Sequence, residues 1–177
     1  MKYLIMTEGS CEKALLDVLI EKSLFFVSIE DLFYEQVFQA RQIDLRLLDM
    51  ISQLPIEEKI TIIRVGDKLN DTLEIDKDLS NRIDNIEKVC TKPEFEILHI
   101  IYQNKYKDFL KVKSTTKPCD YLKSIDDNYR KTYRVNYDYF SKMKEKDLLS
   151  LIEMYCKLRN KIHKKDEKSL SDLLRKK

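Results

Sequence analysis

An apolar run that ends in a glutamate and a glycine opens the chain and constrains its fold more than any other feature. Residues 3–6 are apolar, Thr7-Glu8-Gly9 follows, and apolar residues then recur at helical spacing over 10–22. This order predicts a buried strand, a tight turn and an amphipathic helix. Because open α/β sheets bind ligands beyond the carboxyl ends of their strands, Glu8 becomes a candidate site residue.

The second glycine of the chain repeats this arrangement. The apolar run 60–65 ends in Gly66-Asp67, and Gly9 is the only other glycine among the 177 residues. A chain so poor in glycine is expected to use each one where the backbone needs a positive φ or a close approach. We predict that the two strands are parallel neighbours with Glu8 and Asp67 at one edge of the sheet. The alternative is that Glu8 caps its helix and Asp67 merely starts a turn.

The remaining pattern predicts alternating strands and helices up to about residue 100, and helices afterwards. Before residue 91 we expect a short strand at 24–29, an ambiguous segment at 30–42, a helix at 44–54, loop or weak helix from 68 to 84, and a strand at 86–90. Later we expect a helix from Pro93, with the proline at an early helical position, helices at 117–125, 136–144 and 146–162, and a basic tail at 163–177. The fold class is therefore α/β, with a small, mainly parallel sheet flanked by helices and an α-helical C-terminal extension.

Composition favours a single cytoplasmic unit without a membrane partner. No apolar run approaches the roughly 20 residues of a membrane span, and the N-terminus lacks the basic and apolar regions of a signal peptide. The cysteines at 11, 90, 119 and 156 are scattered, with no CxxC pair. This spacing is typical of reduced thiols and not of a disulfide framework or a zinc site.

The net charge of +2 hides two halves of opposite sign. Residues 1–101 hold 12 Lys and Arg against 20 Asp and Glu, a net of −8, whereas residues 102–177 hold 21 against 11, a net of +10. Eight of the ten tyrosines also follow residue 101. Such a basic, Tyr-rich surface suits phosphate backbones and stacked bases. The alternative is a salt-bridged helical surface with its tyrosines in the core.

Two motifs resemble those of a known family. Thr7-Glu8-Gly9-Ser10-Cys11-Glu12-Lys13 resembles the opening of a TOPRIM (topoisomerase-primase) domain. Thr91-Lys92-Pro93-Glu94-Phe95-Glu96-Ile97-Leu98-His99 resembles a stretch of RloB-like proteins, which are small TOPRIM-like proteins of bacterial restriction and anti-phage loci. The resemblance implies a TOPRIM-like domain over 1–105, on which the basic extension 106–177 packs as one compact unit.

The resemblance also implies divalent-metal chemistry on a phosphodiester. Glu8 matches the catalytic glutamate of the first strand, Asp67 matches one metal-binding aspartate, and Glu96 matches the glutamate of the RloB-like stretch. Where the family has a second aspartate this chain has Leu69, so Asp71 replaces it only if the loop folds back. These hard oxygen ligands suit Mg²⁺ or Mn²⁺.

The neighbours of Glu96 have simpler interpretations. Glu94 suits the positive end of a helix dipole. His99 lies three residues beyond Glu96, so the two are expected to form a structural hydrogen bond or an acid/base pair. Basic residues expected to contact nucleic acid are Lys68, Arg130, Lys131, Arg134, Lys161, Lys164 and Lys165.

Three functions follow from these patterns. The first is a metal-dependent nuclease, or nuclease accessory protein, in anti-phage or restriction-type defence. The second is a catalytically degenerate TOPRIM-like module that binds DNA or RNA. The third is a subunit that docks onto a larger ATPase or effector through its helical half, and a large apolar patch on helix 146–162 would favour it.

Overall fold

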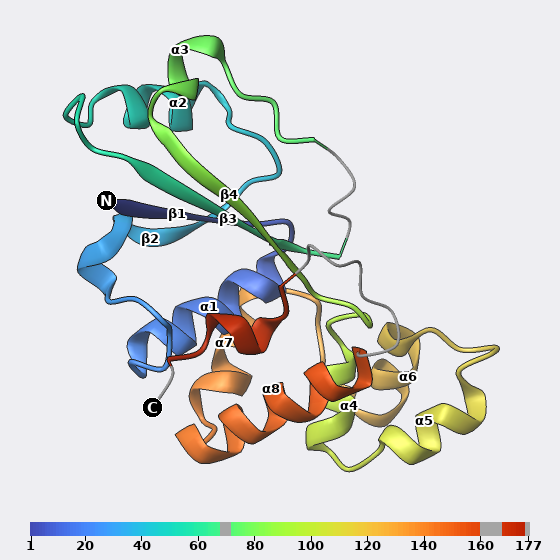
Figure 1. Cartoon of the computed structure of the whole chain (residues 1–177). Helices are drawn as coiled ribbons and strands as arrows, with labels where there is room; N and C mark the ends of the chain where they lie inside the picture. Colours follow the sequence, from blue (N-terminus) through green and yellow to red (C-terminus); the bar gives the residue numbers. More distant parts are fainter. Residues whose placement is uncertain (68–71, 160–167, 176–177) are drawn as a thin grey trace.

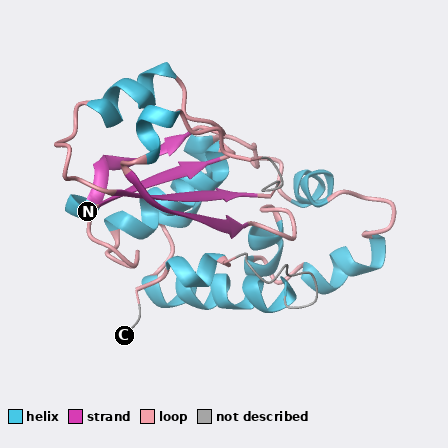
Figure 2. Ribbon diagram, turned by 45° about the horizontal axis from the view of Figure 1, so that its top comes forward, coloured by secondary structure: helices cyan, strands magenta, loops and turns pink. Residues whose placement is uncertain are grey.

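Four parallel strands form the sheet at the centre of the protein, in the order β2-β1-β3-β4 (Figures 1 and 2). The structure is a computed structural model, and it describes residues 1–67, 72–159 and 168–175. The strands are β1 (Lys2–Thr7), β2 (Leu32–Gln39), β3 (Ile60–Gly66) and β4 (Ile83–Cys90). Thr7 of β1 lies opposite Val65 of β3, so the carboxyl ends of the two central strands are level.

Helices cover both faces of the sheet unequally (Figure 1). One face carries α2 (Leu45–Ser52) and the single turn α3 (Lys77–Ser80). The opposite face carries α1 (Ser10–Glu21) and most of the helical extension. Helix α4 (Ile97–Tyr102) precedes the extension. The extension contains α5 (Tyr106–Val112), α6 (Pro118–Ile125), α7 (Tyr133–Ser141), α8 (Glu145–Arg159) and the short 3₁₀ helix η2 (Leu170–Leu173), and another 3₁₀ helix, η1 (Ile29–Asp31), precedes β2. No helix among the described residues has the length and apolar character needed to cross a membrane.

Alternation along the strands divides the core into two clusters. In β1, Leu4 and Met6 pack toward α2 and α3, whereas Ile5 packs toward α1. In β3, Ile62 likewise packs toward α2 and α3, and Ile63 packs toward α1. Side chains of successive strand residues point to opposite faces, so both faces of this parallel sheet must be covered. The β3 run is accordingly apolar except for Thr61 and Arg64, and these two side chains are themselves at most 5 % exposed.

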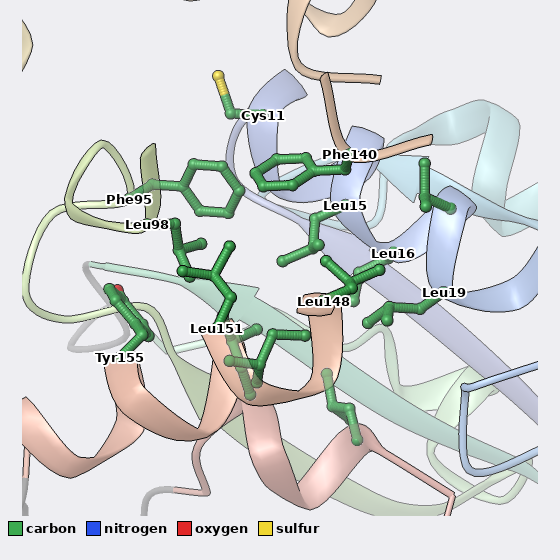
Figure 3. Packing of buried hydrophobic residues seen from close by; sticks show 14 of the residues in the cluster. Cys11, Leu15, Leu16, Leu19, Phe95, Leu98, Phe140, Leu148, Leu151 and Tyr155 are labelled. Carbon is green, nitrogen blue, oxygen red and sulfur yellow. The ribbon is translucent and has the colours of Figure 1, made fainter. Parts of the chain in front are cut away.

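The helical extension shares the larger cluster with the α/β unit (Figure 3). Phe95 and Phe140 meet edge to face, with ring centroids 5.9 Å apart. Leu148 of α8 belongs to the same cluster as Leu15 and Leu19 of α1 (Figure 3). All of these side chains are at most 4 % exposed. Burial of this kind contributes about 1.5–3 kcal/mol per large apolar side chain, so the extension is held against α1 by the main hydrophobic core.

Several sequence predictions are confirmed. Strands 3–6 and 60–65 are parallel neighbours, and the α/β class with a mainly parallel sheet is correct. The helix expected at 44–54 is α2, where Asp44 accepts a hydrogen bond from the backbone N–H of Leu47 at 2.8 Å. The ambiguous segment 30–42 contains β2, and the strand expected at 86–90 is β4.

Two predictions of local structure are wrong. Residues 24–29 form no strand: Phe25 makes one isolated antiparallel bridge with Leu174, and its side chain is fully buried in the larger core. The helix expected from Pro93 begins only at Ile97. The carbonyl of Pro93 accepts a hydrogen bond from the Tyr155 hydroxyl of α8, so a tertiary contact holds this segment outside the helix.

Candidate active site at the carboxyl edge of the sheet

The chain leaves β1 and β3 toward opposite faces of the sheet. Helix α1 follows β1 and packs on one face, whereas Leu73 and Leu79, which follow β3, pack on the other. Parallel α/β sheets open a crevice where two adjacent strands diverge in this way, beyond their carboxyl ends. Glu8 follows β1 and Asp67 follows β3, so both predicted site residues stand at this crevice.

Glu8 packs directly against the glycine that ends β3. A Cβ atom at Gly66 would lie 2.7 Å from Glu8 Oε2 and 2.8 Å from Glu8 Cβ. The backbone N–H of Glu8 donates to the carbonyl of Val65 at 2.9 Å. Gly66 is therefore required for close approach and not for a positive φ, which neither glycine adopts.

A basic residue from the neighbouring strand reaches Glu8. Arg41 follows β2 and places Nη2 2.9 Å from Glu8 Oε1. The side chain of Arg41 is 67 % exposed, whereas that of Glu8 is 14 % exposed. The carboxylate is thus part of the site floor, and the guanidinium lies at its open rim. Sequence reasoning missed Arg41 because it lies in the segment whose structure was ambiguous.

Glu12 is the third carboxyl group of the site and was also missed as a candidate. It lies in the first turn of α1, is 9 % exposed, and has an oxygen 2.5 Å from where a Cβ of Gly9 would stand. Burial raises the pKa of Glu12 above its usual range. A hydrogen bond from its own backbone N–H and the charge of Lys131 lower this pKa, whereas the charges of Asp67 and Glu8 raise it. A buried carboxyl group under the influence of two others is a common mark of a functional site.

Glu96 occupies a position of its own, beside the loop that leads into α7. It is 2 % exposed, and Lys131 Nζ lies 2.8 Å from Glu96 Oε1. Glu94 is exposed, so the two glutamates lie in different environments. Lys131 is 59 % exposed and therefore mirrors Arg41, as a solvent-facing cation paired with a buried carboxylate.

The predicted pairing of His99 with Glu96 is wrong. His99 Nε2 lies 2.8 Å from Asn136 Oδ1, and Asn136 Nδ2 donates to the carbonyl of Thr132 and to Cys11 Sγ. Helix α4 begins at Ile97, so Glu96 and His99 do not share a helix face as expected. The hydrogen-bond partner of His99 is instead Asn136 of α7. Burial raises the pKa of the Cys11 thiol to about 12, so this cysteine is not a nucleophile near neutral pH.

The other predicted nucleic-acid contacts divide into two groups. Arg130 and Arg134 are exposed beside Lys131, and Arg130 Nη1 donates to the carbonyls of Asp127 and Tyr129 at 2.8 Å. Predicted residues that lie outside the described ranges are Lys68, Asp71, Lys161, Lys164 and Lys165.

The described residues contain no complete cage of metal ligands. Within 1–67, 72–159 and 168–175, no group of three or more His, Cys, Asp or Glu residues is arranged to hold a metal ion as the side chains stand. Mg²⁺ often takes only one or two carboxylates from the protein and completes its coordination with water and substrate phosphate. Glu8, Glu12 and Asp67 are hard oxygen donors, and the charges of Glu8 and Asp67 act on Glu12.

The tyrosines of the extension serve largely as packing groups. Tyr129 and Tyr155 are at most 1 % exposed. Tyr133 and Tyr137 stack with ring centroids 5.6 Å apart, and their hydroxyls donate to Asp17 and Glu21 of α1. Tyr129 and Tyr155 are thus core residues, whereas Tyr133 is exposed and Tyr137 half-buried where they hold α7 against α1.

Helix α8 uses its apolar stripe in the same way. The stripe residues Leu148, Ile152, Tyr155 and Cys156 are buried in the protein's own core, and Met154, at 49 % exposed, is the one large apolar side chain of this helix found exposed within the described ranges. A large apolar patch on helix 146–162 would have favoured docking onto a partner, and in the described part of α8 Met154 is the one large apolar side chain that is exposed.

No family model, curated protein or solved structure matches this chain. The resemblance to RloB-like and TOPRIM-like proteins thus stays a prediction based on the two motifs.

Proposed function

We propose that this protein is a metal-dependent nuclease that binds a phosphodiester at the carboxyl edge of its sheet. The observation that carries the proposal is the gathering of Glu8, Glu12 and Asp67 at the crevice between β1 and β3, where burial and like charge raise the pKa of Glu12. Carboxylates brought together without a cation repel one another, and a divalent ion such as Mg²⁺ or Mn²⁺ relieves that repulsion.

The two rim cations supply the phosphate contacts. Arg41 and Lys131 are more than half exposed, and each is held in place by a buried or nearly buried carboxylate. An arriving phosphate competes with Glu8 for the guanidinium of Arg41, which frees Glu8 for a metal ion. The ion pair with Glu96 holds the ammonium group of Lys131 near the carboxyl edge of the sheet.

Glu12 is the residue best suited to carry a proton. Its raised pKa lets it hold a proton closer to neutral pH than an ordinary glutamate does, so it serves as general acid or base toward a phosphodiester oxygen or a water molecule. A metal ion bound by Glu8 and Asp67 would supply charge stabilisation at the phosphate oxygens and lower the pKa of bound water.

The test is cleavage of end-labelled single-stranded RNA and single-stranded DNA, and nicking of plasmid DNA, in Mg²⁺ or Mn²⁺. We expect Glu12→Gln, Glu8→Gln and Asp67→Asn each to lower the rate by at least about 100-fold, the usual size of a lost acid/base or charge-stabilising group. Asp108→Asn is the matched control, because Asp108 is an exposed carboxylate of α5 paired with Lys111. Equal residual activity in wild type and all four variants would refute the assignment.

Binding is measured separately from cleavage, by gel shift across a salt series. Arg41→Gln and Lys131→Gln should weaken binding and flatten its salt dependence, while Arg46→Gln, an exposed arginine on α2, serves as the control. Salt-dependent binding without cleavage, with any partner ATPase or effector supplied, would support the second candidate, a catalytically degenerate module. That candidate is favoured by the leucine at position 69, where the family has an aspartate.

A further inference from the structure

The segment that carries Arg41 is held by hydrogen bonds from three other parts of the protein. Residues 40–42 follow β2, and the backbone N–H of Ala40 donates to the carbonyl of Thr7 at 3.1 Å. Thr7 is the last residue of β1, so this bond extends the pairing of β2 with β1 beyond the end of β2. The start of the segment is thereby fixed beside Glu8, which follows Thr7.

A buried arginine of β3 makes the second hydrogen bond. Arg64 is 5 % exposed, and its Nη2 donates to the carbonyl of Arg41 at 3.2 Å. It lies two residues before Gly66, whose Cβ, if present, would point at Glu8. Residues two apart in a strand share a face, so Arg64 approaches the site from the side on which Glu8 lies. Because the desolvation of a guanidinium is costly, a buried one needs fixed acceptors, and the Arg41 carbonyl is one of them.

Gln42 adds a third contact through both ends of its side-chain amide. Its Nε2 donates to the carbonyl of Thr72 at 3.0 Å, and its Oε1 accepts from the backbone N–H of Glu74 at 2.9 Å. Two hydrogen bonds fix both the position and the direction of the amide. Leu73, which lies between these two partners, is buried in the smaller core cluster, so Gln42 is attached to a packed part of the protein.

These contacts leave the guanidinium of Arg41 available for an anion. They act on the backbone of 40–42 and on Gln42, whereas the Arg41 side chain is 67 % exposed and pairs with Glu8 at 2.9 Å. The guanidinium can therefore exchange Glu8 for an arriving phosphate while its backbone stays in place. An arginine loses side-chain freedom when it binds an anion, and it loses less when its starting position is already fixed.

We propose that Arg64 and Gln42 are positioning residues, which fix the backbone around Arg41 so that its guanidinium meets a substrate phosphate in a prearranged position beside Glu8. Arg64 acts through Arg41 because it is buried, and Gln42 acts through the segment because its amide is bonded to Thr72 and Glu74. This inference deepens the proposed function and rests on it for the origin of the phosphate.

The first measurement is NMR relaxation of the Arg41 Nε–H group in the full chain, without metal or nucleic acid. The signal is assigned by its loss in Arg41→Gln. We expect Arg64→Met and Gln42→Leu each to lower the order parameter of this group. Gln42 is half-buried and uncharged, so its variant tests the inference even if Arg64→Met fails to fold. An order parameter that stays at the wild-type value in Gln42→Leu would overturn the inference.

Arg82→Met and Gln36→Leu are the matched controls. Arg82 also donates to backbone carbonyls, those of Leu54 and Pro55, but it precedes β4 at the opposite end of the sheet. Gln36 is an exposed glutamine of β2. Both control variants should leave the order parameter of Arg41 at its wild-type value. A decrease in either control as large as in Gln42→Leu would overturn the specific role of the positioning residues.

The second measurement is the affinity for fluorescent oligothymidylate and oligouridylate, by anisotropy without metal. We expect Arg64→Met and Gln42→Leu each to weaken binding about two- to tenfold, the cost of ordering one more long side chain on binding. In the Arg41→Gln background neither change should weaken binding further, because the group they position is absent. The same loss in that background, or a loss of Arg41 order without weaker binding, would overturn the inference.

The two measurements separate this inference from the nuclease proposal. Neither needs metal or cleavage, so absence of cleavage in wild type would refute the nuclease proposal and leave both results in force. Active cleavage together with unchanged order of Arg41 in Gln42→Leu would do the opposite, because it would refute the positioning and leave the nuclease proposal standing.

Discussion

Gly66→Ala tests whether the close approach of Glu8 requires a glycine at the end of β3. The new Cβ would lie 2.8 Å from Glu8 Cβ, closer than such atoms approach, and neither Cβ moves without its backbone. Overpacking of this kind costs about 1–3 kcal/mol, and the loss of glycine freedom in the unfolded chain returns about 0.4–1 kcal/mol. We therefore expect a net loss of about 1–2 kcal/mol in the free energy of unfolding, or about 2–8 °C in melting temperature for a chain of this size.

Gly9→Ala is the matched control within the same site. Its Cβ would meet Glu12 Oε2 at 2.5 Å, but that atom is the far end of a side chain that can rotate away. The backbone of Gly9 is extended, with φ −124° and ψ 162°, so alanine adopts it without strain. We expect its unfolding free energy to change by less than about 0.5 kcal/mol, because a gain from the unfolded state offsets the displaced carboxylate.

Urea denaturation followed by circular dichroism measures both variants and a double-mutant cycle. Glu8→Gly removes the atom that Gly66→Ala meets, whereas Glu8→Ala keeps it at the same 2.8 Å. The cost of Gly66→Ala should therefore vanish in the Glu8→Gly background and persist in the Glu8→Ala background. A cost that is the same in both backgrounds, or that Gly9→Ala matches, would refute the close-approach argument.

Two further predictions concern pH. The pKa of Glu12 is raised in the fold above its usual value of 4.5, so its contribution to stability is present below that value and is lost as pH rises through the folded pKa. In thermal melts, Glu12→Gln should accordingly be more stable than wild type at pH 7–8 and should lose this advantage toward pH 4. An advantage that does not change with pH would contradict the argument that the charged Glu12 carboxylate is buried at a cost. The pKa of His99 is lowered from 6.5 to about 4, so wild type should lose stability as pH falls across that interval, by up to about 1.4 kcal/mol per pH unit. Urea titrations at several pH values should show a smaller dependence of stability on pH for His99→Gln than for wild type. An unchanged dependence would mean that groups other than His99 cause the loss of stability.

The local sequence pattern was sufficient to predict the structure of segments whose conformation depends mainly on their own residues. The apolar runs at 3–6 and 60–65 are strands because both faces of a parallel sheet are buried, and Asp44 begins α2 because its side chain caps the helix. The shared edge of Glu8 and Asp67 followed from the same reasoning, since parallel strands end on one side. In β2 the pattern was obscured, because Tyr34 and Glu35 adopt positive φ and the pairing with β1 shifts register there.

Long-range packing decided the rest. Whether Pro93 enters a helix depended on Tyr155, and the partner of His99 came from α7. Arg41 and Lys131 became site residues only because β2 and the loop before α7 end beside buried carboxylates. Periodicity and capping act over a few residues, so the sequence by itself determined strands, helices and the edge where acids collect. Charge pairing acts across space, so only the tertiary structure decided which cations face those acids.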